Sequence, residues 1–169
     1  RRSSDLDMLR RSWSPGVRWG DAFSRQMAAL CSRHGLVILD PRWDGVKRLF
    51  AHIMRAELTE PLSSTALVNE AADRIEHNDA KKRALRRPEG STNLFFETGG
   101  ARRPLTLKDG VFSAGGESFT THEIHHKLDV EPGRFSPAAA LRSVCQDALM
   151  PVAALIAGPG ERAYLDQMR

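Results

Sequence analysis

Apolar residues recur at helical spacing along much of the chain. Their positions predict amphipathic helices over residues 17–33, 44–58, 62–86 and 137–149, and a shorter helix over residues 121–128. The third of these helices has the weakest apolar stripe and ends in a basic run. Helices therefore account for much of the predicted structure.

The predicted helices carry recognisable end signals. Gly35 is placed to end the first helix in the left-handed conformation that glycine adopts readily. Thr120 and Glu123 have the spacing of a capping box at the start of the short helix. Ser136 followed by Pro137 predicts an N-cap and a first helical position for the helix that ends near residue 149.

Two continuous aliphatic runs, at residues 36–39 and 152–157, show no alternation with polar residues. Such runs are typical of strands buried on both faces, as in a parallel sheet covered by helices. Over residues 91–119 the period of the apolar residues falls to two, glycines become frequent, and Asp109-Gly110 is a strong hairpin signal. The pattern therefore predicts an α/β fold with a parallel sheet, interrupted by a small helical and antiparallel β insertion.

The interruption divides the predicted fold into three parts. Residues 1–60 form part of the α/β core, residues 61–133 form the insertion, and residues 134–169 return to the core. The length, 169 residues, is that of about one ordinary domain. Because the chain lacks an initiator Met and its last residues stop within a predicted helix, we expect it to be an internal piece of a longer protein.

Composition excludes several classes of protein. Apolar residues at 41% and charged residues at 27% are typical of a soluble globular chain rather than a disordered one. Cys31 and Cys145 lie within predicted helices, which argues against a disulfide framework and fits a reducing cytoplasm. The longest apolar run is far shorter than the roughly 20 residues that span a bilayer, so no membrane partner is expected.

The charge balance does not by itself identify a partner. Lys+Arg 25 and Asp+Glu 21 give a net charge of +4, which suits an anionic small molecule as well as a polyanion. The basic run from Lys81 to Arg87 has no interleaved aromatic residues that would stack on bases, and cations at a helix end complement the helix dipole. Nucleic-acid binding is therefore not expected.

Three histidines near the short helix invite a metal interpretation. His122, His125 and His126 lie three or four residues apart, so a helix would bring them to one side. Their order with Glu123 is not the His-Glu-x-x-His order of zinc hydrolases. We favour an exposed helix that carries histidines without a metal.

The turn Gly158-Pro159-Gly160-Glu161 lies between an aliphatic run and a last predicted helix. Backbone N–H groups at such a helix start can bind an anion, and open α/β folds bind ligands at the carboxyl ends of their strands. Many turns of this kind bind nothing, and the motif is neither a dinucleotide fingerprint nor a Walker loop.

Polar residues near this turn could extend the site. Arg142, Gln146 and Asp147 could grip an anion from the preceding helix, or could form a solvated face. Asp40, just after the first aliphatic run, could reach a ligand or could bond within its own turn.

Several segments in series resemble the bacillithiol biosynthesis cysteine-adding enzyme family, BshC. The most specific are Arg134-Phe135-Ser136-Pro137, Gln146-Asp147-Ala148-Leu149-Met150-Pro151 and Gly158-Pro159-Gly160-Glu161. Earlier matches lie at residues 14–23, 35–41, 47–49 and 90–95, in the same order and at similar spacing. The resemblance covers essentially the whole chain.

This resemblance implies a Rossmann-like core with connecting-peptide insertions and a homodimer formed through a coiled coil outside this chain. It implies a ligase that joins cysteine to glucosaminyl-malate by an amide bond, and the chemistry leads us to expect ATP as the activating substrate. The family's glycine-rich Rossmann half would then precede Arg1. The predicted binding set is Arg142, Gln146, Asp147, Gly158, Gly160, Glu161 and, from the segment 90–95, Asn93.

The chain departs from the family pattern at two positions of its most specific motif. Ala138 stands where the family usually has Asn, and Ser143 stands where it usually has Pro. The alternative to a ligase is a non-catalytic α/β module that binds an anionic nucleotide or a partner protein through the same turn and the basic run.

Overall fold

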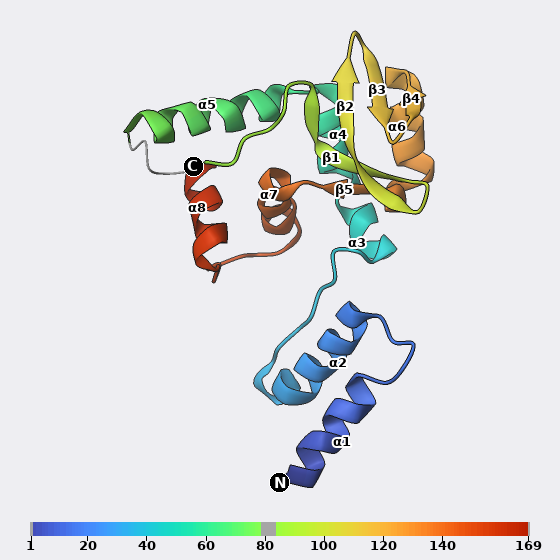
Figure 1. The fold of residues 1–169 in the computed structure, drawn as a ribbon, viewed down its shortest axis with the longest axis vertical. Helices are drawn as coiled ribbons and strands as arrows, with labels where there is room; N and C mark the ends of the chain where they lie inside the picture. The colour runs from blue at the N-terminus through green and yellow to red at the C-terminus, as the bar shows by residue number, and fades with distance from the viewer. Residues whose placement is uncertain (1, 79–83, 169) are drawn as a thin grey trace. The chain divides into compact units, whose positions relative to one another are not determined.

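The computed structural model describes residues 2–78 and 84–168, and the chain divides into two compact units, residues 1–41 and 42–169. Each unit is described by itself (Figure 1). The predicted basic residues Lys81, Lys82 and Arg83 lie outside the described residues. Of the remaining two, Arg86 donates to the carboxylates of Asp73 and Glu76, and Arg87 donates to the carbonyl of Thr92.

The first unit is a pair of helices, α1 (Arg2–Ser12) and α2 (Trp19–Cys31), followed by the short 3-10 helix η1 (Ser32–His34). The predicted helix over residues 17–33 is confirmed, and Gly35 ends it with φ 78° as expected. Helix α1 was not predicted, because its sequence is strongly polar and has little apolar periodicity. Trp19 stacks on Phe23 with ring centroids 5.7 Å apart.

The second unit is built around one antiparallel sheet with the strand order β4-β3-β2-β1-β5. Four of its strands form a meander, which confirms the predicted antiparallel strands over residues 91–119. The fifth strand returns from later in the chain to pair with β1. The strands are β1 (Ser91–Thr98), β2 (Ala101–Lys108), β3 (Val111–Ala114), β4 (Glu117–Phe119) and β5 (Phe135–Pro137).

Glycine-containing turns connect the strands of the meander. Asp109 and Gly110 both have positive φ, 50° and 77°, as a tight hairpin with the right-handed strand twist requires. Gly99-Gly100 and Gly115-Gly116 serve the other two hairpins with the same sign of φ. A Cβ at Gly115 would also lie 2.7 Å from the side chain of Thr98. Both the positive φ and this close contact therefore require glycine at this position.

Helices pack against the sheet and bury one of its faces. The elements α4, α6 and α7 contact β1, β3 or β5, and α5 contacts β1. The helices are α3 (Asp44–Leu49), α4 (Ala51–Thr59), α5 (Ser63–Asn78), α6 (Thr121–Val130), α7 (Ala139–Leu149) and α8 (Pro159–Gln167), with the short 3-10 helix η2 (Pro132–Arg134). The predicted helix over residues 44–58 is thus two helices that meet at Phe50. The predicted helix over residues 62–86 is confirmed for Ser63–Asn78, but its predicted end is wrong, because residues 84–86 are irregular.

The core of this unit lies between the sheet and helices α3, α4, α6 and α7. Phe96 is at its centre, with its ring centroid 5.0 Å from that of Phe135 and 5.3 Å from that of Phe119. The buried cluster comprises Val46, Phe50, Met54, Leu58, Leu94, Phe96, Leu105, Phe112, Ala114, Phe119, Ile124, Leu128, Phe135, Leu141 and Cys145.

The predicted parallel sheet is not confirmed, because the sheet in the described part of the chain is antiparallel. The strand predictions for residues 36–39 and 152–157 are wrong: both runs are irregular and expose aliphatic side chains. A strand needs a neighbour to pair its backbone groups, and no strand among the described residues lies beside either run. The described part of the chain is a mixed α/β structure.

The predicted cap at Ser136 is also wrong. Ser136 and Pro137 pair with β1 as part of β5, and the helix begins two residues later, with Ala138 as its N-cap. The carbonyl of Asn93 accepts the N–H of Ala138, so sheet pairing continues up to the helix and moves its start.

The division of the chain at residues 60 and 133 stays a prediction. The compact units separate instead near Pro41. Residues 42–60, predicted as part of the α/β core, contribute Val46, Phe50, Met54 and Leu58 to the same buried cluster as the β insertion.

Candidate functional site

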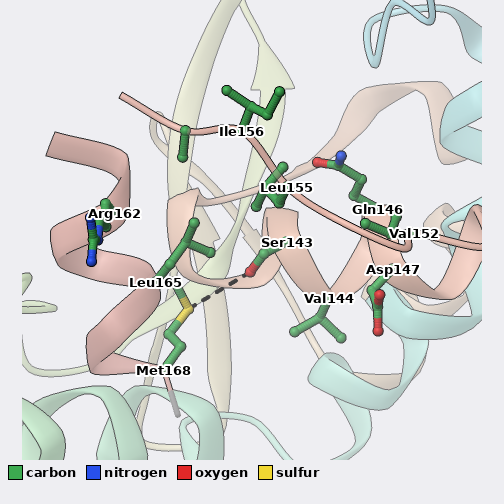
Figure 2. A pocket seen from close by; sticks show the side chains of 11 residues that line it. Ser143, Val144, Gln146, Asp147, Val152, Leu155, Ile156, Arg162, Leu165 and Met168 are labelled. Carbon is green, nitrogen blue, oxygen red and sulfur yellow. Dashed lines mark hydrogen bonds between the residues drawn. The ribbon is translucent and has the colours of Figure 1, made fainter. Parts of the chain in front are cut away.

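A cavity of about 780 Å³ lies between α7, the irregular segment 152–157 and α8. Figure 2 shows the side chains of these three elements around it. The Oγ of Ser143 on α7 lies 3.9 Å from the Sδ of Met168, the C-cap residue of α8. The cavity is lined by Ser143, Val144, Gln146, Asp147, Val152, Leu155, Ile156, Ala157, Arg162, Leu165 and Met168.

The described lining has one side chain of each charge. Asp147 projects from α7 and Arg162 belongs to α8. A smaller cavity of about 100 Å³ adjoins them and is lined by Arg142, Gln146 and Glu161 among others. The structure therefore gathers Arg142, Gln146, Asp147 and Glu161 around neighbouring cavities, which brings carboxylate, amide and guanidinium groups together.

Arg142 lies near a second guanidinium. Arg102 on β2 donates to the Oγ of Ser136 at 2.7 Å and to the carbonyl of Pro137 at 2.9 Å, with its guanidinium 3.7 Å from the ring centroid of Phe95. Burial, and then the charge of Arg142, lower the pKa of Arg102. Because neither arginine forms an ion pair with a carboxylate of the described residues, this region favours an anion.

The glycine turn is placed as predicted, at the start of α8. Gly158 is the N-cap residue, and its N–H donates to the Oε2 of Glu161 at 3.3 Å. This puts the protein's own carboxylate at the positive end of the helix. A Cβ at Gly158 or Gly160 would have no atom within 4 Å, so packing in this chain does not require either glycine.

Asn93 lines neither of the cavities around Arg142, Gln146 and Asp147. It lies on β1 and lines another cavity, of about 290 Å³, between α5, α7 and α8, which shares Val144 and Met168 with the larger one. It belongs instead to a buried polar network with Glu57, Ser64 and Thr65. The prediction that Asn93 binds a ligand with the other six residues stays untested, as does the role of each of them.

The sequence interpretation missed three members of this network and, among the charged residues that line the larger cavity, Arg162. Glu57 stands on the same helical face as Met54 and Leu58, and a carboxylate on a buried face is the signal that could have identified it. Ser64 and Thr65 had no such signal. Arg162, in the first turn of α8, follows directly on the predicted turn.

Arg87, from the basic run, lies near this network and bonds to its neighbours. It donates to the carbonyl of Thr92 at 2.6 Å, and its backbone N–H donates to the Oδ1 of Asn69 at 2.9 Å. Burial lowers the pKa of Arg87, while the charge of Glu57 opposes that shift. This part of the basic run is structural.

The family model for the N-terminal Rossmann-like domain of the bacillithiol biosynthesis protein BshC matches residues 2–169. The chain belongs to this family. The resemblance seen in the sequence is thereby confirmed.

Curated BshC relatives support the same assignment. The chain is 37% identical over 146 residues to one from Thermus thermophilus, covering 86% of the chain and 30% of the relative. It is 34% identical over 165 residues to one from Koribacter versatilis, covering 98% of the chain and 31% of the relative. One from Salinibacter ruber is also 34% identical, over 96% of the chain and 30% of the relative.

Each of these relatives carries the name "Putative cysteine ligase BshC". By these names the family is one of ligases in bacillithiol biosynthesis. The chain spans about 30% of the length of the relatives that it matches.

Membrane spans and metal clusters are both absent from the described residues. No helix there is long and apolar enough to cross a membrane. No group of three or more His, Cys, Asp and Glu side chains is arranged there to hold a metal ion, and His122, His125 and His126 lie on α6.

Proposed function

We propose that this chain forms part of a ligase that joins the carboxyl group of cysteine to the amine of glucosaminyl-malate. The observation that carries the proposal is the BshC family match over residues 2–169, with relatives named as cysteine ligases. The arrangement of Arg142, Gln146, Asp147 and Glu161 around adjoining cavities supports a polar ligand at this place.

The chemistry needs an activated carboxyl group, since an amine does not displace hydroxide from a free carboxylate. In the proposed reaction, a carboxylate oxygen of cysteine attacks the α-phosphorus of ATP and releases pyrophosphate. The sugar amine then attacks the acyl carbon, forms the amide, and releases AMP and a proton. Arg142 would bind the phosphate or carboxylate charge, because a guanidinium matches the geometry of both oxyanions.

The test is product formation by a full-length protein of this family that carries this chain as its segment. Cysteine, glucosaminyl-malate and ATP are supplied, and the amide product, AMP and pyrophosphate are followed by mass spectrometry. Detection of all three supports the proposal. Absence of the amide product from a folded protein contradicts it.

Variants of the same protein test the site. Arg142→Ala should lower kcat/KM about tenfold or more and reduce its dependence on salt, because a charge-assisted contact is removed. Arg103→Ala is the matched control, since Arg103 is an exposed arginine on β2 that lines none of these cavities. Equal activity of the two variants would contradict the role of Arg142 but would not contradict the proposed reaction.

Gly160→Val tests whether a ligand approaches the backbone of the turn. The structure has room for the new side chain, so the melting temperature should change little while ligand affinity falls about tenfold. Unchanged affinity would show that the turn does not bind the ligand.

A further inference from the structure

Arg102 on β2 does not pair with the carboxylate opposite it in the sheet. In the register of β1 and β2, Arg102 lies directly across from Glu97, so both residues belong to the same face. Opposite charges at such positions attract each other. No ion pair joins these two residues in the described part of the chain, so other contacts must direct the arginine.

Those contacts bring the Arg102 guanidinium across β1 to the start of α7. It lies over the ring of Phe95 on β1, and its Nε donates to the Oγ of Ser136 on β5 at 2.7 Å. Its Nη2 donates to the carbonyl of Pro137 at 2.9 Å. Pro137 directly precedes Ala138, the N-cap residue of α7. The protein therefore holds Arg102 at the beginning of that helix by its own contacts.

Arg142 approaches the same place from the helix. Its backbone N–H donates to the carbonyl of Ala138 at 3.0 Å, so these two residues lie one helical turn apart on the same side of α7. Side chains on a helix lean towards its N-terminus, which directs Arg142 towards Ala138 and the neighbouring carbonyl that Arg102 binds. Burial, and then the nearby charge of Arg142, lower the pKa of Arg102.

The two guanidiniums keep donors that no described group uses. The Nη1 of Arg102 donates to no described acceptor, and the side chain of Arg142 forms no hydrogen bond or ion pair with the described residues. Both side chains are exposed, so a ligand can reach them. Two neighbouring cations repel each other, and an anion bound between them removes that repulsion.

We propose that Arg102 and Arg142 bind one diphosphate group between them. This rests on the proposed function, to which it adds Arg102 as a binding residue and phosphate as the group that Arg142 binds. A diphosphate carries oxyanion oxygens on adjacent phosphorus atoms, so each guanidinium can bind its own phosphate through paired hydrogen bonds. The donors of Arg102 that remain after its bonds to Ser136 and Pro137 suffice for this.

The experiment measures binding of inorganic pyrophosphate by calorimetry to the full-length protein that carries this chain. Arg102→Gln removes the charge but keeps a polar side chain, so the affinity should fall about tenfold or more while the melting temperature changes little. Arg102→Lys keeps the charge without the planar fork and should bind more tightly than Arg102→Gln. Arg103→Gln is the matched control, because this neighbouring exposed arginine lies on the other face of β2, and it should bind like the parent.

Parent-like pyrophosphate binding by folded Arg102→Gln would overturn the proposal. So would malate, a dicarboxylate, if it binds more tightly than pyrophosphate with the same dependence on Arg102. If Arg102→Gln fails to fold, Arg142→Gln, at an exposed position of α7, decides in the same way.

Competition by ADP distinguishes the two sources of the diphosphate group. Displacement of pyrophosphate by ADP supports the phosphate chain of a nucleotide as the ligand, and its absence supports released pyrophosphate. Product formation with pyrophosphate binding unaltered by these variants contradicts the arginine pair alone. The expected binding pattern without any amide product contradicts the proposed function alone.

Discussion

At the scale of single residues, Glu57 and Asn93 connect four elements of the second unit. Glu57 on α4 binds the backbone of Asn93 on β1 and the hydroxyl of Ser64 on α5. The carbonyl of Asn93 accepts the N–H of Ala138 at the start of α7. One buried carboxylate therefore helps to set the positions of the helices around the 290 Å³ cavity.

We expect Glu57→Ala to lower the free energy of unfolding by about 2–3 kcal/mol, because the buried N–H of Asn93 and the hydroxyl of Ser64 lose their acceptor. Urea denaturation of the two proteins measures the difference. Glu57→Gln keeps one acceptor oxygen and should cost less. A loss below about 0.5 kcal/mol for Glu57→Ala, typical of a surface site, would contradict the structural role of this carboxylate.

At the scale of elements, the helix starts differ in how they are capped. Helix α6 has a complete capping box: Thr120 Oγ1 accepts the N–H of Glu123 at 3.2 Å, and Glu123 Oε2 accepts the N–H of Thr120 at 2.7 Å. Helix α7 begins at Ala138, which has no capping side chain. Ala138, the position where the sequence resemblance leads us to expect Asn, is therefore an N-cap.

The hydrogen bonds from Thr120 to Glu123 lower the pKa of that carboxyl below its usual 4.5. A lowered carboxyl pKa contributes stability above the unfolded-state pKa, and this contribution is lost as the pH falls through the folded-state pKa. Thr120→Ala should therefore destabilise the protein by about 1 kcal/mol near neutral pH. The difference from the parent should shrink below about pH 4, as measured by thermal unfolding at several pH values. A difference that does not vary with pH would contradict this.

Ala138→Asn should stabilise the protein by about 1 kcal/mol, because its side chain can accept a first-turn N–H of α7. The measurement is again the free energy of unfolding in urea. Ala148→Asn, in the last turn of the same helix, is the control and should be neutral or destabilising. Destabilisation by Ala138→Asn would mean that the buried surroundings of Ala138 leave no room for a cap.

At the scale of the whole molecule, two aliphatic runs are exposed that a folded chain usually covers. Val37 is 86% exposed in the first unit, and Ile156 is 99% exposed in the second. Both lie in irregular segments with few backbone hydrogen bonds among the described residues. Exposed aliphatic segments of this kind favour association.

We expect the 169-residue chain alone to aggregate on heating or concentration, and Val37→Ser with Ile156→Ser to reduce the aggregation without lowering the melting temperature. Light scattering and thermal unfolding measure the two effects. Val130→Ser removes a similar exposed valine outside the runs and should not reduce aggregation. Equal improvement by this control would show that the runs themselves are not responsible.

Local sequence patterns by themselves determine much of this protein. The hairpin at Asp109-Gly110, the capping box at Thr120 and the glycine that ends the helical segment after residue 34 were predicted correctly, because the conformations of these segments depend on residues within a few positions. The family likewise follows from motifs that are continuous in sequence.

Only the tertiary structure decided what depends on neighbours distant in sequence. The aliphatic runs at 36–39 and 152–157 are irregular because a strand requires a partner, which no run of residues can show by itself. Ser136 lies in strand β5 and does not cap a helix, because its backbone pairs with the edge of β1. Arg102 and Arg142 meet at the start of α7 although they lie far apart in the sequence, so only the folded arrangement could reveal them as a pair.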